Sequence, residues 1–162
     1  MLTKKMEKAL NDQINAELYS SYLYLSMASF FESQSWLGFA KWMELQAAEE
    51  YAHGMKFYKH INEMGGRAEL QAIEKPKAEW SSLVQVFEEA HKHELYITER
   101  INNLVEVAAA EKDHATGIFL QWFVTEQVEE VAGVAQIVND FHKIGDSKGS
   151  LYMLDRQLGK RQ

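Results

Sequence analysis

Glu49-Glu50-Tyr51-Ala52-His53 combines two acidic side chains and one imidazole within a helical pattern. Glu50 and His53 are three positions apart, so on an α-helix they lie on one face, one turn from each other. The pattern recurs 77 positions later, and in each copy a single Glu precedes the pair by 33 residues. The corresponding positions are Glu17 and Glu94, Glu49 and Glu126, Glu50 and Gln127, and His53 and Glu130. The sequence therefore contains two copies of one unit.

Four long segments around these residues show helical periodicity, at about residues 4–34, 38–64, 82–111 and 115–143. Their inner positions recur at steps of three and four residues, which is typical of helices that pack in a bundle. In the first segment these positions are Met6, Leu10, Gln13, Glu17, Ser20, Tyr24, Met27 and Phe31. A shorter pattern at about residues 147–159 predicts a fifth helix.

The connections between the segments predict the topology. Tight turns are expected at residues 33–38 and 112–114, whereas residues 67–80 form a long linker with the only proline. Fully extended, such a linker reaches roughly 46 Å, and a 27-residue helix is about 40 Å long. The second and third helices can therefore point the same way. We expect an all-α four-helix bundle with one long crossover, between helices 2 and 3, and a short C-terminal helix, as a single domain over residues 1–162.

The composition excludes several classes of protein. The chain has no Cys, which rules out disulfides, zinc ribbons, iron–sulfur clusters and thiol nucleophiles. Its net charge of −7, without a basic patch, makes nucleic acid a poor partner. The longest apolar-rich stretch, residues 18–31, is too short to span a bilayer, and from the charged first residues we expect no signal peptide. We expect a cytoplasmic protein with no membrane partner.

The polar residues of the inner stripes lie at one predicted depth. Glu17 precedes Ser35 in the first turn by 18 residues, and Glu50 follows it by 15. Glu94 and Gln127 stand at the same distances from Lys112 in the second turn. Since near-equal distances from a hairpin turn mean near-equal depth, the polar side chains converge on one layer of the core. This layer holds Glu17, Glu50, His53, Glu94, Gln127 and Glu130.

Four carboxylates in one buried layer need compensation, because each costs several kcal/mol to bury and like charges add to that cost. No Lys or Arg occupies an inner position nearby, so protons or divalent cations must neutralise them. A histidine among carboxylates favours iron, manganese or zinc over calcium. An isolated Glu-x-x-His pair is more often a solvated surface pair than a ligand set. Six such residues at one depth favour a site for two metal ions.

The sequence resembles the non-haem ferritins of bacteria and archaea, within the ferritin-like di-iron superfamily. The resemblance covers nearly the whole chain and is carried by residues 11–24, 49–53 and 119–130. The general ligand pattern of this superfamily implies that Glu17, Glu50 and His53 bind the first iron. It also implies that Glu94 and Glu130 bind the second iron, with Glu50 bridging and Gln127 nearby.

The same resemblance implies further roles near the pair. Glu49, Glu126 and Glu129 would form a third iron position, although from the sequence alone they are nearly as well explained as ordinary solvated helix surface. Tyr24 resembles the redox tyrosine of the family, against the alternative of a core tyrosine, and Trp122 is a neighbouring aromatic of similar use.

One departure from the superfamily pattern concerns the second pair, which is Gln127-x-x-Glu130 instead of Glu-x-x-His. With fewer anionic and nitrogen ligands, this position should hold metal more loosely, which suits iron in transit. Tyr51 follows Glu50 where a haem-binding bacterioferritin would carry Met, so no haem is expected.

The resemblance implies an iron-storage ferritin that oxidises Fe(II) with O2 or peroxide and deposits Fe(III) mineral inside a shell of 24 chains. Apolar residues on the outer side of the first helix, Leu18, Tyr22, Leu25 and Phe30, fit such an assembly. Two alternatives remain open at this point. One is a di-metal enzyme that oxidises a small substrate or detoxifies peroxide, which the absence of a rubredoxin-like Cys tail weakens. The other is a structural bundle without metal.

Overall fold

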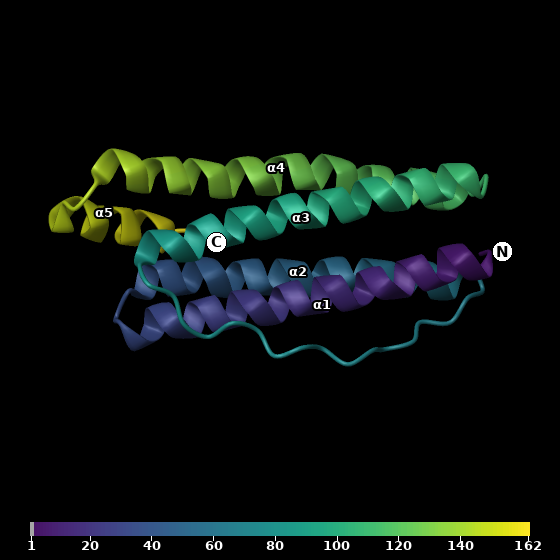
Figure 1. Cartoon of the computed structure of the whole chain (residues 1–162), viewed down its shortest axis with the longest axis horizontal. Helices are drawn as coiled ribbons and strands as arrows, with labels where there is room; N and C mark the ends of the chain where they lie inside the picture. Colours follow the sequence, from purple (N-terminus) through teal and green to yellow (C-terminus); the bar gives the residue numbers. More distant parts are fainter. Residues whose placement is uncertain (1) are drawn as a thin grey trace.

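Five helices make up the fold, and the first four lie side by side as a bundle with α5 at one end (Figure 1). The computed structural model describes residues 2–162, so Met1 of the predicted domain lies outside the described range. The helices are α1 (Lys4–Ser33), α2 (Leu37–Glu63), α3 (Leu83–Ala110), α4 (His114–Ile144) and α5 (Lys148–Leu158). No strand occurs in the described range, and each helix end lies within one residue of its prediction. The predicted all-α bundle is confirmed.

Side-chain caps explain where most of the helices begin. In each case a hydroxyl or carboxylate accepts a hydrogen bond from a backbone N–H that the first turn leaves unpaired. The capping residues are Thr3 for α1, Ser82 for α3, Asp113 for α4 and Ser147 for α5. His114, predicted in the turn, instead begins α4, because Asp113 is the cap.

Two consecutive glycines, Gly65 and Gly66, follow the end of α2. Gly65 has φ +76, a left-handed conformation that glycine adopts without the steric penalty of a Cβ. The backbone N–H of Gly66 then donates to the carbonyl of Ile61 at 2.9 Å, which closes the helix end.

The crossover between α2 and α3 runs along the bundle beside α1, so α2 and α3 point the same way, as predicted (Figure 1). Three side chains of α1 donate hydrogen bonds to the crossover at successive positions along the bundle. Asn11 donates to the carbonyl of Arg67 at 3.0 Å, Asn15 to that of Ala72 at 3.0 Å and Ser26 to that of Lys77 at 2.6 Å. The irregular segment therefore has a fixed path, and its polar backbone groups find partners on the helix.

The crossover also covers part of α1 that was expected to face another subunit. The ring centroid of Trp80 lies 5.3 Å from that of Phe30, and both side chains are buried. The expectation that Phe30 is free for assembly is wrong, because Trp80 covers it within the chain. Tyr22 and Leu25 do remain about half exposed, at 49% and 48%.

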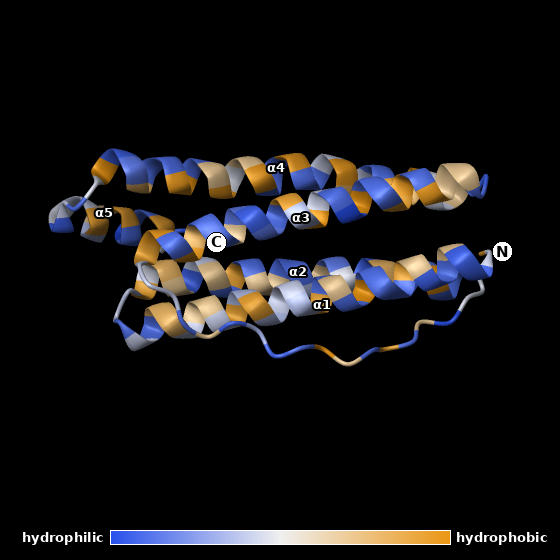
Figure 2. Cartoon of the chain, viewed as in Figure 1, coloured by the Kyte–Doolittle hydropathy of each residue, from blue (hydrophilic) through white to orange (hydrophobic). Residues whose placement is uncertain are grey.

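Hydrophobic and polar positions alternate along the four long helices, as Figure 2 shows, and the apolar ones build two clusters. One cluster, nearer α5, includes Phe31, Phe39 and Phe87. The other, towards the opposite end, includes Met6, Phe57 and Ile101. The predicted polar layer lies along the helices between these clusters. None of the helices in the range 2–162 is both long and apolar enough to cross a membrane.

Candidate metal centre

All six residues of the predicted polar layer lie in the core. Glu17 comes from α1, Glu50 and His53 from α2, Glu94 from α3, and Gln127 and Glu130 from α4. The first five side chains are buried, with Glu17 and Glu50 each 1% exposed, and Glu130 is half-buried. The structure thus brings together the residues that the sequence placed at one depth.

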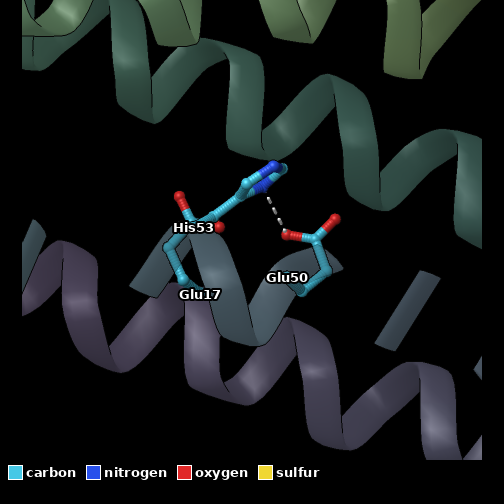
Figure 3. A group of neighbouring side chains, drawn as sticks. All are labelled: Glu17, Glu50 and His53. Atoms are coloured by element: carbon cyan, nitrogen blue, oxygen red, sulfur yellow. Dashed lines mark ion pairs between the residues drawn. The ribbon is translucent and has the colours of Figure 1, made fainter. Parts of the chain in front are cut away.

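Three overlapping groups of ligand atoms arise from this arrangement, each with its atoms within 4.8 Å of one another. Glu17, Glu50 and His53 form the first group, and Figure 3 shows them projecting from α1 and α2 toward a common space. Glu50, Glu94 and Glu130 form the second group. Glu50 therefore belongs to both groups.

A third group lies nearer the surface and consists of His53, Glu126 and Glu130. Nε2 of His53 is 3.9 Å from Oε1 of Glu126. We call this group the outer position. It shares Glu126 with the third iron position that the resemblance implied.

Burial is the largest cause of the raised pKa values of the carboxyl groups in the centre. It raises the pKa of Glu17 well above its ordinary value, and the neighbouring Glu50 carboxylate raises it further. Burial also raises the pKa of Glu50, which is then raised again by Glu94 and Glu130. The pKa of Glu94 is raised by burial, and that of Glu130 is raised, mainly by burial, to about 7. Without a cation, the folded protein therefore holds these groups partly protonated.

Two carboxylate oxygens of the centre accept no hydrogen bond from any residue in the range 2–162, namely Oε2 of Glu17 and Oε2 of Glu50. The second oxygen lies 3.4 Å from Nδ1 of His53. Buried oxygens of this kind are rare because each costs a desolvation penalty. The donor set, with carboxylates beside one imidazole and two orphaned oxygens, fits divalent iron, zinc or manganese.

Neutral side-chain amides donate hydrogen bonds to other carboxylate oxygens of the centre. Nε2 of Gln13 donates to Oε1 of Glu17 at 2.8 Å. Nε2 of Gln46 donates to Oε2 of Glu130 at 2.6 Å and to Oε1 of Glu50 at 3.3 Å. These amides orient the ligands without adding a competing positive charge. The role of Gln13 and Gln46 was not predicted from the sequence; the available signal was a Gln four residues before Glu17 and before Glu50.

Gln127 also acts as a donor. Its Nε2 atom lies 3.2 Å from Oε2 and 3.2 Å from the backbone carbonyl of Glu94, and 3.1 Å from Oγ1 of Thr98. The hydroxyl of the buried Tyr24 donates to the other oxygen of Glu94. Burial, with Glu94 next in weight, raises the pKa of Tyr24 well above its ordinary value. Both side chains thus hold Glu94 in place.

The remaining predicted site residues lie around an open cavity of about 430 Å³ beside the centre. Glu49, Glu126, Glu129 and Glu130 line it, together with Arg161. Oε2 of Glu49 is 2.6 Å from Nη2 of Arg161, so Glu49 is held by an ion pair. Outside the cavity lining, the ring of Trp122 lies 5.4 Å from that of His53 and carries the ammonium of Lys56 at 4.2 Å.

Comparison with known proteins gives a consistent picture. A family model described as ferritin-like domain matches residues 7–144. The bacterial non-heme ferritin of Staphylococcus aureus (strain MRSA252) is 41% identical over 161 residues, covering 99% of this chain and 97% of that protein. The bacterial non-heme ferritin of Bacteroides fragilis (strain 638R) is also 41% identical, covering 99% and 100%.

Solved structures of an archaeal ferritin have the same fold as this chain. An open pore ferritin from the hyperthermophilic archaeon Archaeoglobus fulgidus superposes with a TM-score of 0.99 at 50% identity, covering 100% of this chain and 99% of that one. An engineered closed form of the same ferritin has a TM-score of 0.99 at 49% identity.

Proposed function

This chain belongs to the ferritin family, and from that premise we propose that its buried metal centre is the di-iron site of Fe(II) oxidation. Iron storage with oxidation of Fe(II) is the function of the chain, which follows from the family and from the bacterial non-heme ferritins that it resembles over their full length. Iron is therefore a substrate and cargo here, and the residues of the centre are described by what they do to it.

The proposed ligands follow from the geometry of the centre. Glu17, Glu50 and His53 take the first Fe(II), and Glu50, Glu94 and Glu130 take the second, so that Glu50 bridges them. The orphaned oxygens Oε2 of Glu17 and Oε2 of Glu50 are the single observation that carries this assignment. Each is buried and accepts no hydrogen bond, and a cation would compensate its charge.

Charge balance explains why such a site favours oxidation and then release. Four ionised carboxylates offset two Fe(II) ions in formal charge, and the same hard oxygen ligands attract Fe(III) more strongly. Each Fe(II) gives up one electron; O2 takes up the two electrons and two protons to become hydrogen peroxide, or peroxide with two protons becomes two waters. The two Fe(III) ions then exceed the ligand charge by two, which favours their hydrolysis and onward transfer.

Loose binding at the second position supports transfer. Gln127 stands where the superfamily pattern has a carboxylate, and here it donates hydrogen bonds to Glu94. We propose that the outer position, with Glu49 and Glu129 on the rim of the same cavity, receives iron in transit. Tyr24, hydrogen-bonded to Glu94, is the proposed electron donor within the centre, and Trp122 beside His53 is a second candidate.

We propose that the chains assemble into a shell of 24 subunits in the cytoplasm. The half-exposed apolar residues Tyr22 and Leu25 of α1, and the exposed Tyr152 and Met153 of α5, support an assembly through these helices. A shell gives the oxidised iron an enclosed volume in which to mineralise.

The test is aerobic addition of Fe(II) to metal-free protein, followed by desalting and a count of iron per chain. Retention far above two supports storage in a shell, whereas about two supports the alternative of a di-metal enzyme. Glu50→Ala should lose rapid oxidation, while Glu99→Ala, an equal charge change at an exposed position of α3, should keep it. Retention near zero in folded wild-type protein would overturn the ligand assignment.

A further inference from the structure

The segment that follows α5 returns to the metal centre through one side chain, Arg161. Its Nη1 atom donates to Oε1 of Gln46 at 2.9 Å, and its Nη2 atom donates to Oε2 of Glu49 at 2.6 Å. The guanidinium lies 4.8 Å from the ring centre of Trp42, and the side chain is 23% exposed. Arg161 therefore has a defined place between α2 and the cavity.

The contact with Gln46 determines which way that amide faces. A guanidinium has donors only, so the carbonyl oxygen of Gln46 must face Arg161 and its NH2 group must face the ligands Glu130 and Glu50. Reversal of the amide would place a carbonyl oxygen against the carboxylate of Glu130. Arg161 thus orients two ligands of the centre through one amide.

The same arrangement occurs at the neighbouring helix α1. Nε of Arg100 donates to Oε1 of Gln13 at 3.0 Å, and Nε2 of Gln13 donates to Glu17. Two Arg–Gln–Glu chains therefore reach the centre, one on α1 and one on α2. Arg161 also binds a carboxylate of the cavity rim, Glu49, whereas Arg100 donates to the backbone carbonyl of Asp12 and to the hydroxyl of Tyr96.

The ion pair with Glu49 opposes a cation in the outer position. Glu49 lines the same cavity as Glu126 and Glu130, so it can become a further ligand of a cation in the outer position only if Arg161 releases it. Arg161 satisfies the charge of Glu49 while the position is empty, and its own positive charge repels a neighbouring cation.

We propose that Arg161 is a positioning residue of the metal centre that limits cation binding at the outer position by holding Glu49. The inference rests on the proposed function, since it assumes that the centre takes metal. Linkage makes the effect reciprocal: a cation at the outer position weakens the hold of Arg161, which loosens residues 159–162.

Redox-inert Zn(II) is the probe, titrated calorimetrically into the metal-free assembled protein, with sites assigned from zinc occupancy in crystals. Arg161→Gln should bind zinc at the outer position about fivefold more tightly, the value expected for release of a partly exposed ion pair. Arg161→Lys keeps a charge for Glu49 and should stay close to wild type. Lys160→Gln, an equal charge change at the neighbouring exposed residue, should have no effect.

Arg100→Gln shows whether the loss of an Arg–Gln contact alone, without the loss of an ion pair to Glu49, changes zinc binding. It frees the amide of Gln13 but leaves Glu49 paired, so affinity at the outer position should not change. Hydrogen exchange gives a readout independent of iron chemistry: zinc at the outer position of the wild type should speed exchange of residues 159–162.

The proposal is overturned if Arg161→Gln behaves as Lys160→Gln does, if zinc bound at the outer position leaves that exchange unchanged, or if neither the wild type nor Arg161→Gln fills the outer position. Failure of zinc to bind Glu17, Glu50 and His53 would instead overturn the proposed function. The two failures are therefore distinguishable.

Discussion

The hydroxyl of Tyr24 donates a hydrogen bond to Oε1 of Glu94 and so joins α1 to α3 inside the metal centre. Both residues are fully buried, at 0% exposure. Burial raises the pKa of the Glu94 carboxyl, and this hydrogen bond opposes the rise by stabilising the carboxylate. Tyr24 therefore keeps Glu94 closer to the ionised form that a metal ion requires.

Replacing Tyr24 with Phe removes the donor and leaves Gln127 as the remaining side-chain partner of Glu94. We expect metal-free Tyr24→Phe to lose about 1–2 kcal/mol of unfolding free energy, measured by denaturant titration, and to oxidise Fe(II) more slowly. Tyr51→Phe, at a position 54% exposed, is the control. Equal stabilities of the two variants would contradict a structural role for the bond.

The pH dependence of the metal-free protein follows from the raised carboxyl pKa values. Glu130 has an ordinary value of 4.5 and a folded value of about 7, so over this range the folded state keeps a proton that the unfolded state has lost. Glu17 and Glu50 shift in the same direction. Because the folded state binds more protons, the unfolding free energy falls as pH rises.

His93 acts in the opposite direction at lower pH. Burial lowers its pKa from 6.5 to about 4, so its contribution to stability is lost as pH falls through that range. The carboxyls are therefore best observed above pH 6.5. We expect the melting temperature of metal-free protein to fall between about pH 6.5 and 8, and less steeply in Glu130→Gln. A rise over that interval would refute the assignment.

Glu17→Gln replaces a buried acid with a neutral group of the same shape. Without metal, the variant should be as stable as wild type or more stable by about 1–2 kcal/mol, because the cost of burying or protonating Glu17 disappears. Its stabilisation by added Zn(II) should be largely lost. Thermal melting with and without zinc measures both effects, and Glu99→Gln on the exposed side of α3 should match wild type in both.

Gln127→Glu restores the acidic ligand of the superfamily pattern. We expect about tenfold tighter zinc binding at the group of Glu50, Glu94 and Glu130. The metal-free protein should be less stable, since a new carboxylate would face Oε2 of Glu94. Iron should also leave the centre more slowly after one turnover, measured by the recovery of oxidation activity. Unchanged recovery would show that Gln127 does not govern release.

Docking of α5 depends on a glycine at the start of α2. A Cβ at Gly38 would lie 1.8 Å from the carbonyl oxygen of Asp155, whereas a Cβ at Gly117 would meet no described atom within 4 Å. Gly38→Ala should cost about 1–3 kcal/mol and displace the segment that carries Arg161. Gly117→Ala should instead add about 0.5–1 kcal/mol within α4. Chemical denaturation of both variants provides the comparison.

Much of this architecture could be predicted from the spacing of residues alone. Every inner position predicted for α1, from Met6 to Phe31, is buried. Helical periodicity fixes which face a side chain occupies, and distance from a turn fixes its depth in a hairpin. Those two quantities placed Glu17, Glu50, His53, Glu94 and Glu130 in one layer without knowledge of any contact.

The parts that escaped prediction depend on irregular segments. Phe30 has the spacing of an exposed residue, but the path of the crossover brings Trp80 over it. Arg161 belongs to a short tail without periodicity, and its partner Gln46 is 115 positions away. No local pattern encodes such a contact, because it requires the docked position of α5.

The long crossover also has a consequence for how the protein folds. The α1–α2 and α3–α4 hairpins each close through a short turn, whereas the crossover of residues 64–82 separates them. Each hairpin contributes only part of the ligand set, so the carboxylates stay hydrated until the hairpins dock. Docking therefore bears the full desolvation penalty, and it is the step with the largest loop-closure entropy. We expect a divalent cation to offset part of that penalty, so that the hairpins dock more readily when metal is present.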